Sequence, residues 1–394
     1  NKYYRRIYKF SNSKIGRCIM TDYKTIRGKK IKSFATDLGN DQAEGQIFYS
    51  ETDNQFKTTV GSAAWSSGGN LIDSRYAIDP GNFGTQTASL GVGGYTGTAI
   101  TGKTEEYNGS GWTSGGDLNT ARYYIIGGGT QTAAFGAGGI DSTGTVANGE
   151  EYNGTSWSET NDLNTAIRNA AGTGTQTAGL AFGGNDPGSP AVVTGTEEYD
   201  GTNWTEAGAM NTGRRSLGGA GLQTSGLAFG GDVGPPGSSV ATEEYNGTSW
   251  TSVNNMPAVQ RAAGSGGTQT SAIYMGGDLR PGAQFGRTTI IYDGTNWTTS
   301  ANLGTGRYEL GGSAANSSAA VAFGGFTPGA TSATEEFNIS ANIITSDTWA
   351  SGGNYPDTTH GLQGDGTQTA AFAAGGGADL DSTKEYDGSS WTAG

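Results

Sequence analysis

Short segments of apolar and small residues recur along the chain at a fixed spacing, separated by turn-forming residues. Each unit holds four such segments, for which 123–126 (YYII), 175–184 (TQTAGLAFGG), 242–245 (TEEY) and 250–252 (WTS) serve as examples. Short runs with β-branched and aromatic residues, bounded by Gly, Asn or Asp, are typical of strands. The pattern therefore predicts units of four short strands, each unit forming one antiparallel sheet.

Tryptophan opens the fourth segment of each unit and marks the period. The eight tryptophans stand at positions 65, 112, 157, 204, 250, 297, 349 and 391. A period of about 40–50 residues with strand-like segments is the signature of a β-propeller, in which each repeat is a four-stranded blade. Seven complete sets of segments follow one another, so the sequence predicts an all-β, seven-bladed propeller with a short N-terminal β-hairpin extension.

Trp65 stands in a fourth-strand segment, 65–71, that lacks the first three strands. A propeller commonly closes by completing its last blade with a strand from the other terminus, which removes an exposed sheet edge. The fourth strands at Trp65 and Trp391 therefore compete for one place near the closure. An eighth blade remains open if the chain continues past Gly394.

Glycine marks two kinds of junction in each unit. Asn-Gly or Asp-Gly joins the third segment to the fourth, as at Asn246-Gly247, and favours a tight two-residue hairpin of type I′. A Gly-Gly doublet ends the second segment, as at Gly183-Gly184. Because glycine weakens a strand unless the backbone bends or a neighbour comes close, we expect the doublets at the crowded hub. Tyr and Trp then fill the space between blades.

The order Gly-Gly, Tyr, Trp at these spacings resembles the kelch repeat over roughly residues 65–394. The segments 130–139, 242–251 and 118–122 are similar in sequence to kelch-like repeat proteins of marine phages and uncultivated viruses. Two units depart from the pattern: the fifth carries Ile290-Ile291 where others carry an acidic pair, and the sixth carries Phe337 in place of Tyr.

A different segment precedes the repeats. Residues 43–49 and 55–57 flank a turn at 52–54 and predict one hairpin. The segment resembles a short module near the N-termini of phage tail and head appendage proteins. Since a lone two-stranded hairpin is unstable, it would pack on the propeller, trimerise or dock on a larger particle. The predicted organisation is a basic arm at 1–19, either upstream translation or disordered, an anchor module at 20–60, and the propeller at 61–394.

Charge separates the two ends of the chain. Residues 1–32 carry 11 of the 23 Lys and Arg residues, whereas residues 33–394 carry 35 of the 36 acidic residues. An acidic body repels nucleic acid and anionic membrane, so the propeller should bind neither. The basic head could contact nucleic acid or an acidic partner, or remain a solvated arm. Cys18 is the single cysteine, which excludes an internal disulfide framework, and its role stays open.

The composition argues against the catalytic sites known on related folds. The kelch resemblance includes a copper radical oxidase of the galactose oxidase type, which implies two His and a thioether-forming Cys; this chain has only His360 and Cys18. A serine or cysteine triad would also need a histidine base. The chain is therefore predicted to be no enzyme and to hold no metal or cofactor, although Ca²⁺ at the acidic pairs remains a minor alternative.

Arginine recurs once per unit, and so does an acidic pair such as Glu197-Glu198. Repetition at a fixed position indicates structure, so we expect exposed Arg–Glu ion pairs at the blade edges. The arginines concerned are Arg75, Arg122, Arg168, Arg214, Arg261 and Arg307.

The connections between the Gly-Gly doublet and the acidic segment vary in length and content, whereas the opposite turns are nearly uniform. Variable loops on a rigid scaffold are where recognition usually resides. The alternative is that they are merely tolerated insertions. The candidate contact residues are Tyr95, Asp186, Arg280, Phe285 and Phe326.

Three functions follow from these observations. The first is a non-enzymatic virion protein, a phage tail or capsid appendage or decoration protein, whose propeller loops bind a host-surface glycan or protein while residues 20–60 bind other virion proteins. The second is a kelch-type protein–protein interaction adaptor in the cytoplasm, and the third a glycan-active enzyme. The first places the chain on the virion or outside the cell. The ligand, the host and any homo-oligomeric state are left open.

Overall fold

In the computed structural model the chain is all-β, as predicted: every regular element among the described residues is a strand. The chain divides into two compact units, Asn1–Gly61 with Ala341–Gly394, and Ser62–Ser340. The structure describes residues 55–78, 82–188, 192–234, 237–279 and 285–345, and the separate strand segments 23–26, 29–31, 33–34, 47–50, 363–367, 370–374, 383–386 and 391–393.

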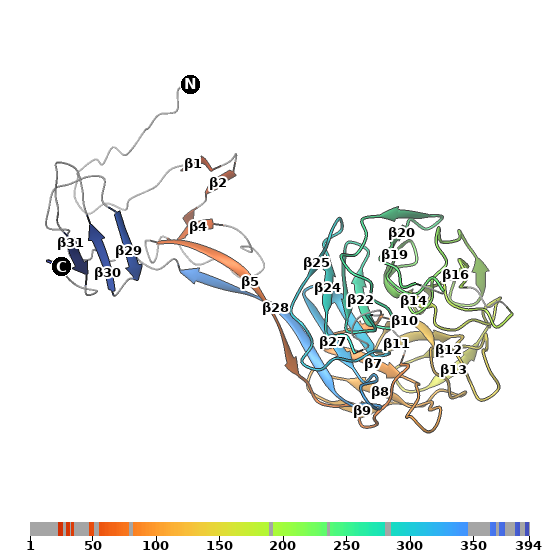
Figure 1. Cartoon of the computed structure of the whole chain (residues 1–394). Coiled ribbons are helices and arrows are strands. Elements are labelled where there is room, and N and C mark those ends of the chain that lie inside the picture. The colour runs from red at the N-terminus through yellow and green to blue at the C-terminus, as the bar shows by residue number, and fades with distance from the viewer. Residues whose placement is uncertain are drawn as a thin grey trace. The chain divides into compact units, whose positions relative to one another are not determined.

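The unit Ser62–Ser340 has a β-propeller-like fold of antiparallel sheets arranged around a common centre (Figure 1). The first sheet contains β6 (Asn82–Thr85), β7 (Ala88–Val92), β8 (Thr104–Tyr107) and β9 (Trp112–Ser114). The second contains β10 (Ile126–Thr130), β11 (Ala133–Ala137), β12 (Gly149–Tyr152) and β13 (Trp157–Thr160). Their innermost strands, β6 and β10, also pair in parallel over two residues.

The next three sheets repeat this plan in chain order. The third contains β14 (Ala171–Thr175), β15 (Ala178–Phe182), β16 (Thr196–Tyr199) and β17 (Trp204–Glu206). The fourth contains β18 (Gly218–Leu222), β19 (Ser225–Phe229), β20 (Thr242–Tyr245) and β21 (Trp250–Val253). The fifth contains β22 (Gly264–Thr268), β23 (Ser271–Met275), β24 (Thr289–Tyr292) and β25 (Trp297–Thr299).

The sixth sheet is completed from the N-terminal side. After β26 (Gly311–Asn316), β27 (Ala319–Phe323) and β28 (Thr334–Thr345), the next strand in the sheet is β5 (Gln55–Ser67). Trp65 in β5 makes the contact of the other tryptophans: its indole Nε1 donates to Thr289 Oγ1 at 3.0 Å, as Trp157 Nε1 donates to Thr104 Oγ1 at 2.8 Å. The ring of Trp65 also packs on Phe337, with centroids 5.2 Å apart.

The sixth sheet contacts the first in the way that each sheet contacts the next. Gly325 N donates to Arg75 O at 2.9 Å, which repeats the bond from Gly184 N to Arg214 O at 2.7 Å between the third and fourth sheets. Trp112 Nε1 in the first sheet likewise donates to Thr334 Oγ1 in the sixth at 2.9 Å.

Among the described residues of this unit, six sets of strands follow one another, the first two joined through β6 and β10, and the number of blades stays a prediction. The seventh set of segments forms β29 (Gln363–Thr367), β30 (Ala370–Ala374), β31 (Thr383–Tyr386) and β32 (Trp391–Ala393), a sheet within the other unit. The predicted competition between Trp65 and Trp391 is resolved in favour of Trp65, because β5 already occupies the edge of β28. Trp349 lies outside the described residues.

The predicted N-terminal hairpin is confirmed. Strand β4 (Ile47–Ser50) pairs antiparallel with the beginning of β5, where Tyr49 lies opposite Phe56. In the same unit, β3 (Ser33–Phe34) pairs in parallel with β4, and β1 (Tyr23–Ile26) pairs antiparallel with β2 (Lys29–Ile31). Residues 1–19 lie outside the described residues.

The Gly-Gly doublets lie where neighbouring sheets crowd together, as predicted. Gly183 has φ of +70°, and a Cβ atom there would lie 2.6 Å from the backbone oxygen of Arg214 in the next sheet. Both the left-handed backbone and the close approach therefore require glycine at this position.

The Asn-Gly turns differ from the predicted two-residue type. Tyr107 lies opposite Trp112, so four residues separate the third strand from the fourth. Asn108 Oδ1 accepts hydrogen bonds from Ser110 N and Gly111 N, each at 3.0 Å, and only Gly109 of the four has positive φ. The asparagine side chain therefore organises the loop by bonding backbone two and three residues on.

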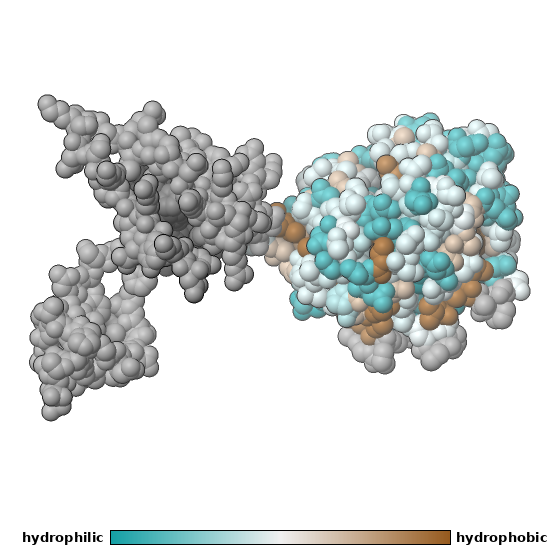
Figure 2. Space-filling view, turned by 90° about the horizontal axis from the view of Figure 1, so that it is seen from above, coloured by the Kyte–Doolittle hydropathy of each residue, from teal (hydrophilic) through white to brown (hydrophobic). Residues whose placement is uncertain are grey.

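The hydrophobic core lies between sheets, as expected for Tyr and Trp on the outer strands. Phe135 of the second sheet contacts Tyr199 and Trp204 of the third, with ring centroids 6.3 and 5.6 Å away. All three side chains are buried. The face of this unit seen in Figure 2 is mostly hydrophilic, with hydrophobic residues in small separate areas.

Candidate functional site

The two ends of the sheets differ in content. One end carries the segments that precede the first strands and the connections that follow the Gly-Gly doublets, and we call this end the loop face. Isolated bridges such as Tyr76 with Tyr95 join these two kinds of segment. We call turn face the opposite end, where the Asn-Gly loops lie against the Thr-Gln-Thr turns, as Gly154 does against Thr132. The predicted separation of variable loops from uniform turns is therefore present.

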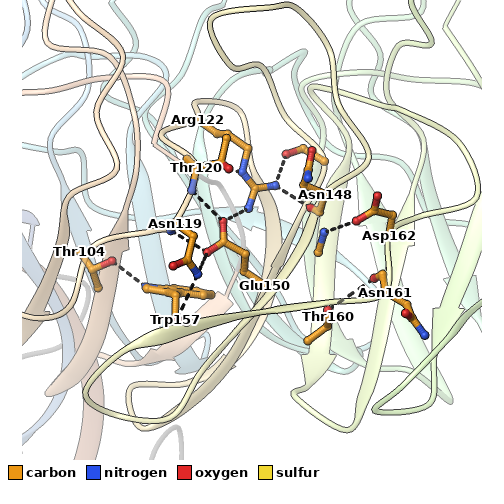
Figure 3. A network of polar contacts seen from close by, with 12 residues as sticks. Thr104, Asn119, Thr120, Arg122, Asn148, Glu150, Trp157, Thr160, Asn161 and Asp162 are labelled. Carbon is orange, nitrogen blue, oxygen red and sulfur yellow. Dashed lines mark hydrogen bonds and ion pairs between the residues drawn. The ribbon is translucent and has the colours of Figure 1, made fainter.

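A buried arginine lies beneath the loop face in four sheets. The guanidinium of Arg122 is fully buried; its Nη2 lies 2.8 Å from Glu150 Oε1, and its Nη1 donates to Gly138 O and Asn148 O (Figure 3). We call these four arginines, together with their glutamates, the arginine belt. Its pairs are Arg75–Glu105 at 3.1 Å, Arg122–Glu150 at 2.8 Å, Arg214–Glu243 at 2.9 Å and Arg307–Glu335 at 2.9 Å.

The belt confirms the predicted Arg–Glu pairing but not its predicted exposure. Burial lowers the pKa of the Arg122 guanidinium, and the adjacent Glu150 carboxylate opposes that shift. Glu150 also accepts hydrogen bonds from Asn119 N at 2.8 Å and Asn119 Nδ2 at 2.9 Å. Removing one member of such a buried pair leaves an uncompensated charge, so the belt stabilises the ends of these four sheets and is not a surface feature.

Arg168 and Arg261, which the sequence aligned with the belt, lie one residue further along. The belt position is occupied in their sheets by Ile167 and Gln260, which are buried. On the loop face, Arg168 forms a backbone β-bridge with Asn185, and Arg261 forms one with Asp278. The alignment was wrong by one residue because the arginine of these two units stands one position after the belt position, which holds another residue.

Half of the loop face is aromatic. Tyr76 packs edge-on against Tyr95 and Phe326, with centroid distances of 5.5 and 5.0 Å. Contacts continue from Tyr95 to Tyr123 at 5.9 Å and from Phe326 to Phe285 at 6.3 Å. We call aromatic arc this connected set of partly exposed rings: Tyr76, Tyr95, Tyr123, Tyr124, Tyr308, Phe285 and Phe326.

The arc brings together three of the five candidate residues, Tyr95, Phe285 and Phe326. Tyr76, Tyr123 and Tyr308 were not among the predicted contact residues, because they precede the first strands and do not lie in the connections after the doublets. A signal was present: an Arg-Tyr dipeptide precedes the first strand in the first, second and sixth units.

The other half of the loop face is ionic. Arg261 Nη2 lies 3.0 Å from Asp278 Oδ2, and its Nη1 pairs with Asp232. Asp232 also pairs with Arg215 Nη2 at 3.2 Å, and Arg215 Nη1 donates to Asn185 Oδ1 at 3.2 Å. These alternating charges neutralise one another and join the third, fourth and fifth sheets.

The remaining candidates stand apart from both halves. Asp186 accepts a hydrogen bond from Gly188 N at 2.7 Å within its own loop. Arg280 lies outside the described residues. Arg168 is partly exposed, and within the described part of the chain its guanidinium has no acceptor.

A pocket lies at the hub, inside both halves. Each sheet contributes one residue with φ between 48° and 55°: Ala77, Tyr124, Asn169, Ser216, Ala262 and Glu309. Five of these donate a backbone hydrogen bond to the residue of the preceding sheet, including Ala77 N to Glu309 O at 2.9 Å and Tyr124 N to Ala77 O at 3.0 Å. The pocket is lined by Ile78, Tyr124, Asn169, Ala170, Ser216, Ala262, Ala263, Glu309 and Leu310.

The pocket contains one carboxyl group. Tyr124 OH donates to Glu309 Oε1 at 2.6 Å. Burial raises the pKa of Glu309, and burial together with this carboxylate raises the pKa of Tyr124. This site was not predicted from the sequence, because the residue type at the equivalent positions differs from sheet to sheet.

Within the described ranges, no three His, Cys, Asp or Glu side chains are grouped so as to hold a metal ion. The same part of the chain contains no helix long and apolar enough to cross a membrane. Neither a scan against protein-family models nor a search of curated proteins found a match for this chain.

Proposed function

We propose that the chain is a non-enzymatic binding protein. Ser62–Ser340 would be a closed, six-bladed propeller of the kelch type that recognises its ligand on the loop face. The hydrogen bonds and tryptophan contacts from the sixth sheet to the first support closure, and the Gly-Gly, Tyr, Trp order supports the kelch assignment.

The observation that carries the proposal is the aromatic arc. Its rings are only partly buried, so packing within the fold does not use all of their surface. Aromatic side chains offer a large rigid contact area at little cost in conformational entropy, and tyrosine adds a hydroxyl for hydrogen bonding. Such a surface suits the flat, partly apolar faces of sugar rings, which favours a host-surface glycan as the ligand and a protein surface as the second possibility.

The biological setting rests on resemblance. The N-terminal hairpin and the wording of the repeats are similar to those of phage appendage proteins, so we place this protein on a virion, outside the host cell. Residues 20–60 would bind other virion proteins, and the propeller would bind the host.

The test is to replace Phe326 by Ala and measure binding of the full chain to glycan arrays and host cells. We expect a loss of about tenfold or more, because aromatic anchors at the centre of an interface dominate binding energy. Leu222→Ala is the control, since Leu222 is 52% exposed and is the last residue of β18, at the turn face. Unchanged binding for Phe326→Ala together with reduced binding for Leu222→Ala would mean that the ligand binds the turn face, which contradicts the proposal.

A further inference from the structure

Glu309 is a carboxylate that the fold does not require. Five equivalent residues with the same backbone conformation surround it, and none is charged: Ala77, Tyr124, Asn169, Ser216 and Ala262. The ring of backbone hydrogen bonds at the hub uses only their main-chain groups. A glutamate at this position therefore needs a reason other than folding.

The carboxylate lacks a cation of its own. Its Oε1 accepts from Tyr124 OH, whereas within the described residues its Oε2 has no hydrogen-bond partner. The charged and titratable groups that face it are Tyr124, Tyr76, Asp278 and Arg261. Of these only Arg261 is a cation, and it is already paired with Asp232 and Asp278. Burying a carboxylate in this way is unfavourable unless a positive charge accompanies it.

We propose that Glu309 binds the protonated amine of the ligand, an inference that rests on the proposed function of the loop face. An ammonium group in the hub pocket would donate hydrogen bonds to Glu309 Oε2 and lie beside the ring of Tyr124, since aromatic faces attract cations. The cavity volume of about 20 Å³ suits one small group rather than a quaternary ammonium. The ligand class is thus a molecule with a primary amine, such as an amino sugar with a free amine or a lysine side chain.

The first experiment titrates the full chain with ethylammonium, followed by NMR, at pH 7. We expect saturable binding that Glu309→Gln weakens by about tenfold or more, because a buried charge pair loses one partner. Glu206→Gln removes the same charge from an exposed position on β17 and should leave binding unchanged. Tetramethylammonium should bind more weakly than ethylammonium. Glucosamine, N-acetylglucosamine and lysine methyl ester then distinguish the two sources of the amine.

The pH dependence gives an independent readout. Binding needs the ionised carboxylate, and burial raises the pKa of Glu309, so affinity should fall with decreasing pH at a higher pH than an ordinary glutamate would produce. Glu309→Gln should abolish this dependence. Tyr124→Phe, which keeps the ring but removes the hydroxyl, provides a second variant should Glu309→Gln not fold.

Two results would overturn the inference. One is the absence of ethylammonium binding by the wild-type chain, and the other is equal binding by wild type and Glu309→Gln. If Phe326→Ala loses attachment to arrays or cells while Glu309→Gln keeps it, the amine site is wrong and the proposed function stands. If neither change affects attachment, the proposed function itself falls.

Discussion

The arginine belt and the loop face lie one residue apart in the chain, yet they obey different rules. At the belt position, Arg122 and Arg214 are fully buried and make the same contacts in each sheet. At the next position, Tyr123 and Arg215 are partly exposed and differ in chemistry. Repetition therefore marks what the fold needs, and departure from repetition marks where a ligand can be recognised.

In the fifth sheet all three residues of the belt contact are replaced. Gln260 replaces the arginine, and its Nε2 donates to Gly276 O and, at 3.2 Å, to Thr288 O, the counterparts of the carbonyls that Arg122 contacts. Ile290 replaces the glutamate. Pro257, which has no N–H, replaces the asparagine whose N–H bonds that glutamate in the second sheet. In this sheet the three changes occur together, whereas in the third sheet Ile167 replaces the arginine and Glu197 is retained, accepting from Asn164 N at 2.8 Å and from Asn164 Nδ2 at 2.9 Å.

The largest effect is expected from breaking this concerted change. Ile290→Glu alone should lower the free energy of unfolding by about 3–5 kcal/mol, because it buries a carboxylate without a partner. Combining it with Gln260→Arg and Pro257→Asn should recover most of that loss, as measured by urea unfolding. A triple variant no more stable than the single one would mean that the belt contacts do not form as a set.

A hydrogen bond between tyrosine and glutamate, which links neighbouring sheets, shows the same kind of paired change. Tyr152 OH donates to Glu106 in the preceding sheet at 2.5 Å, and Tyr199 OH to Glu151 at 2.7 Å. Between the fifth and sixth sheets both partners are absent, since Ile291 and Phe337 take their places. Here too the two members of a pair have changed together.

Tyr152→Phe should therefore lower the free energy of unfolding by about 1 kcal/mol near neutral pH. Burial raises the pKa of Tyr152 to about 12, so ionisation of the unfolded chain near its ordinary pKa destabilises the native state as pH rises toward 12. The variant should lose less stability than wild type over that range. Urea unfolding at pH 7 and pH 11 measures both effects, and equal alkaline losses in the two chains would contradict the assignment.

Most of the fold could be predicted from the sequence because its strands and turns are set by local chemistry repeated many times. The fourth strand of the sixth sheet could not be predicted, because it comes from about 270 positions away in the chain. The periodicity alone cannot choose between Trp65 and Trp391 for that place. The loop connections led to Tyr95, Phe285 and Phe326. Glu309 could not be predicted, because it lies beside Tyr124 only in the folded chain, 185 positions away in sequence.

The most direct test of the distinction between belt and loop face compares two arginines that the sequence placed at the same position. We expect Arg122→Ala to lower the free energy of unfolding by about 3–5 kcal/mol, because Glu150 is left buried without its cation. Arg168→Ala should change it by no more than about 0.5 kcal/mol, since the guanidinium is partly exposed and unpaired among the described residues. Urea unfolding of the two variants decides the matter: unequal losses of this size support the account, and equal losses contradict it.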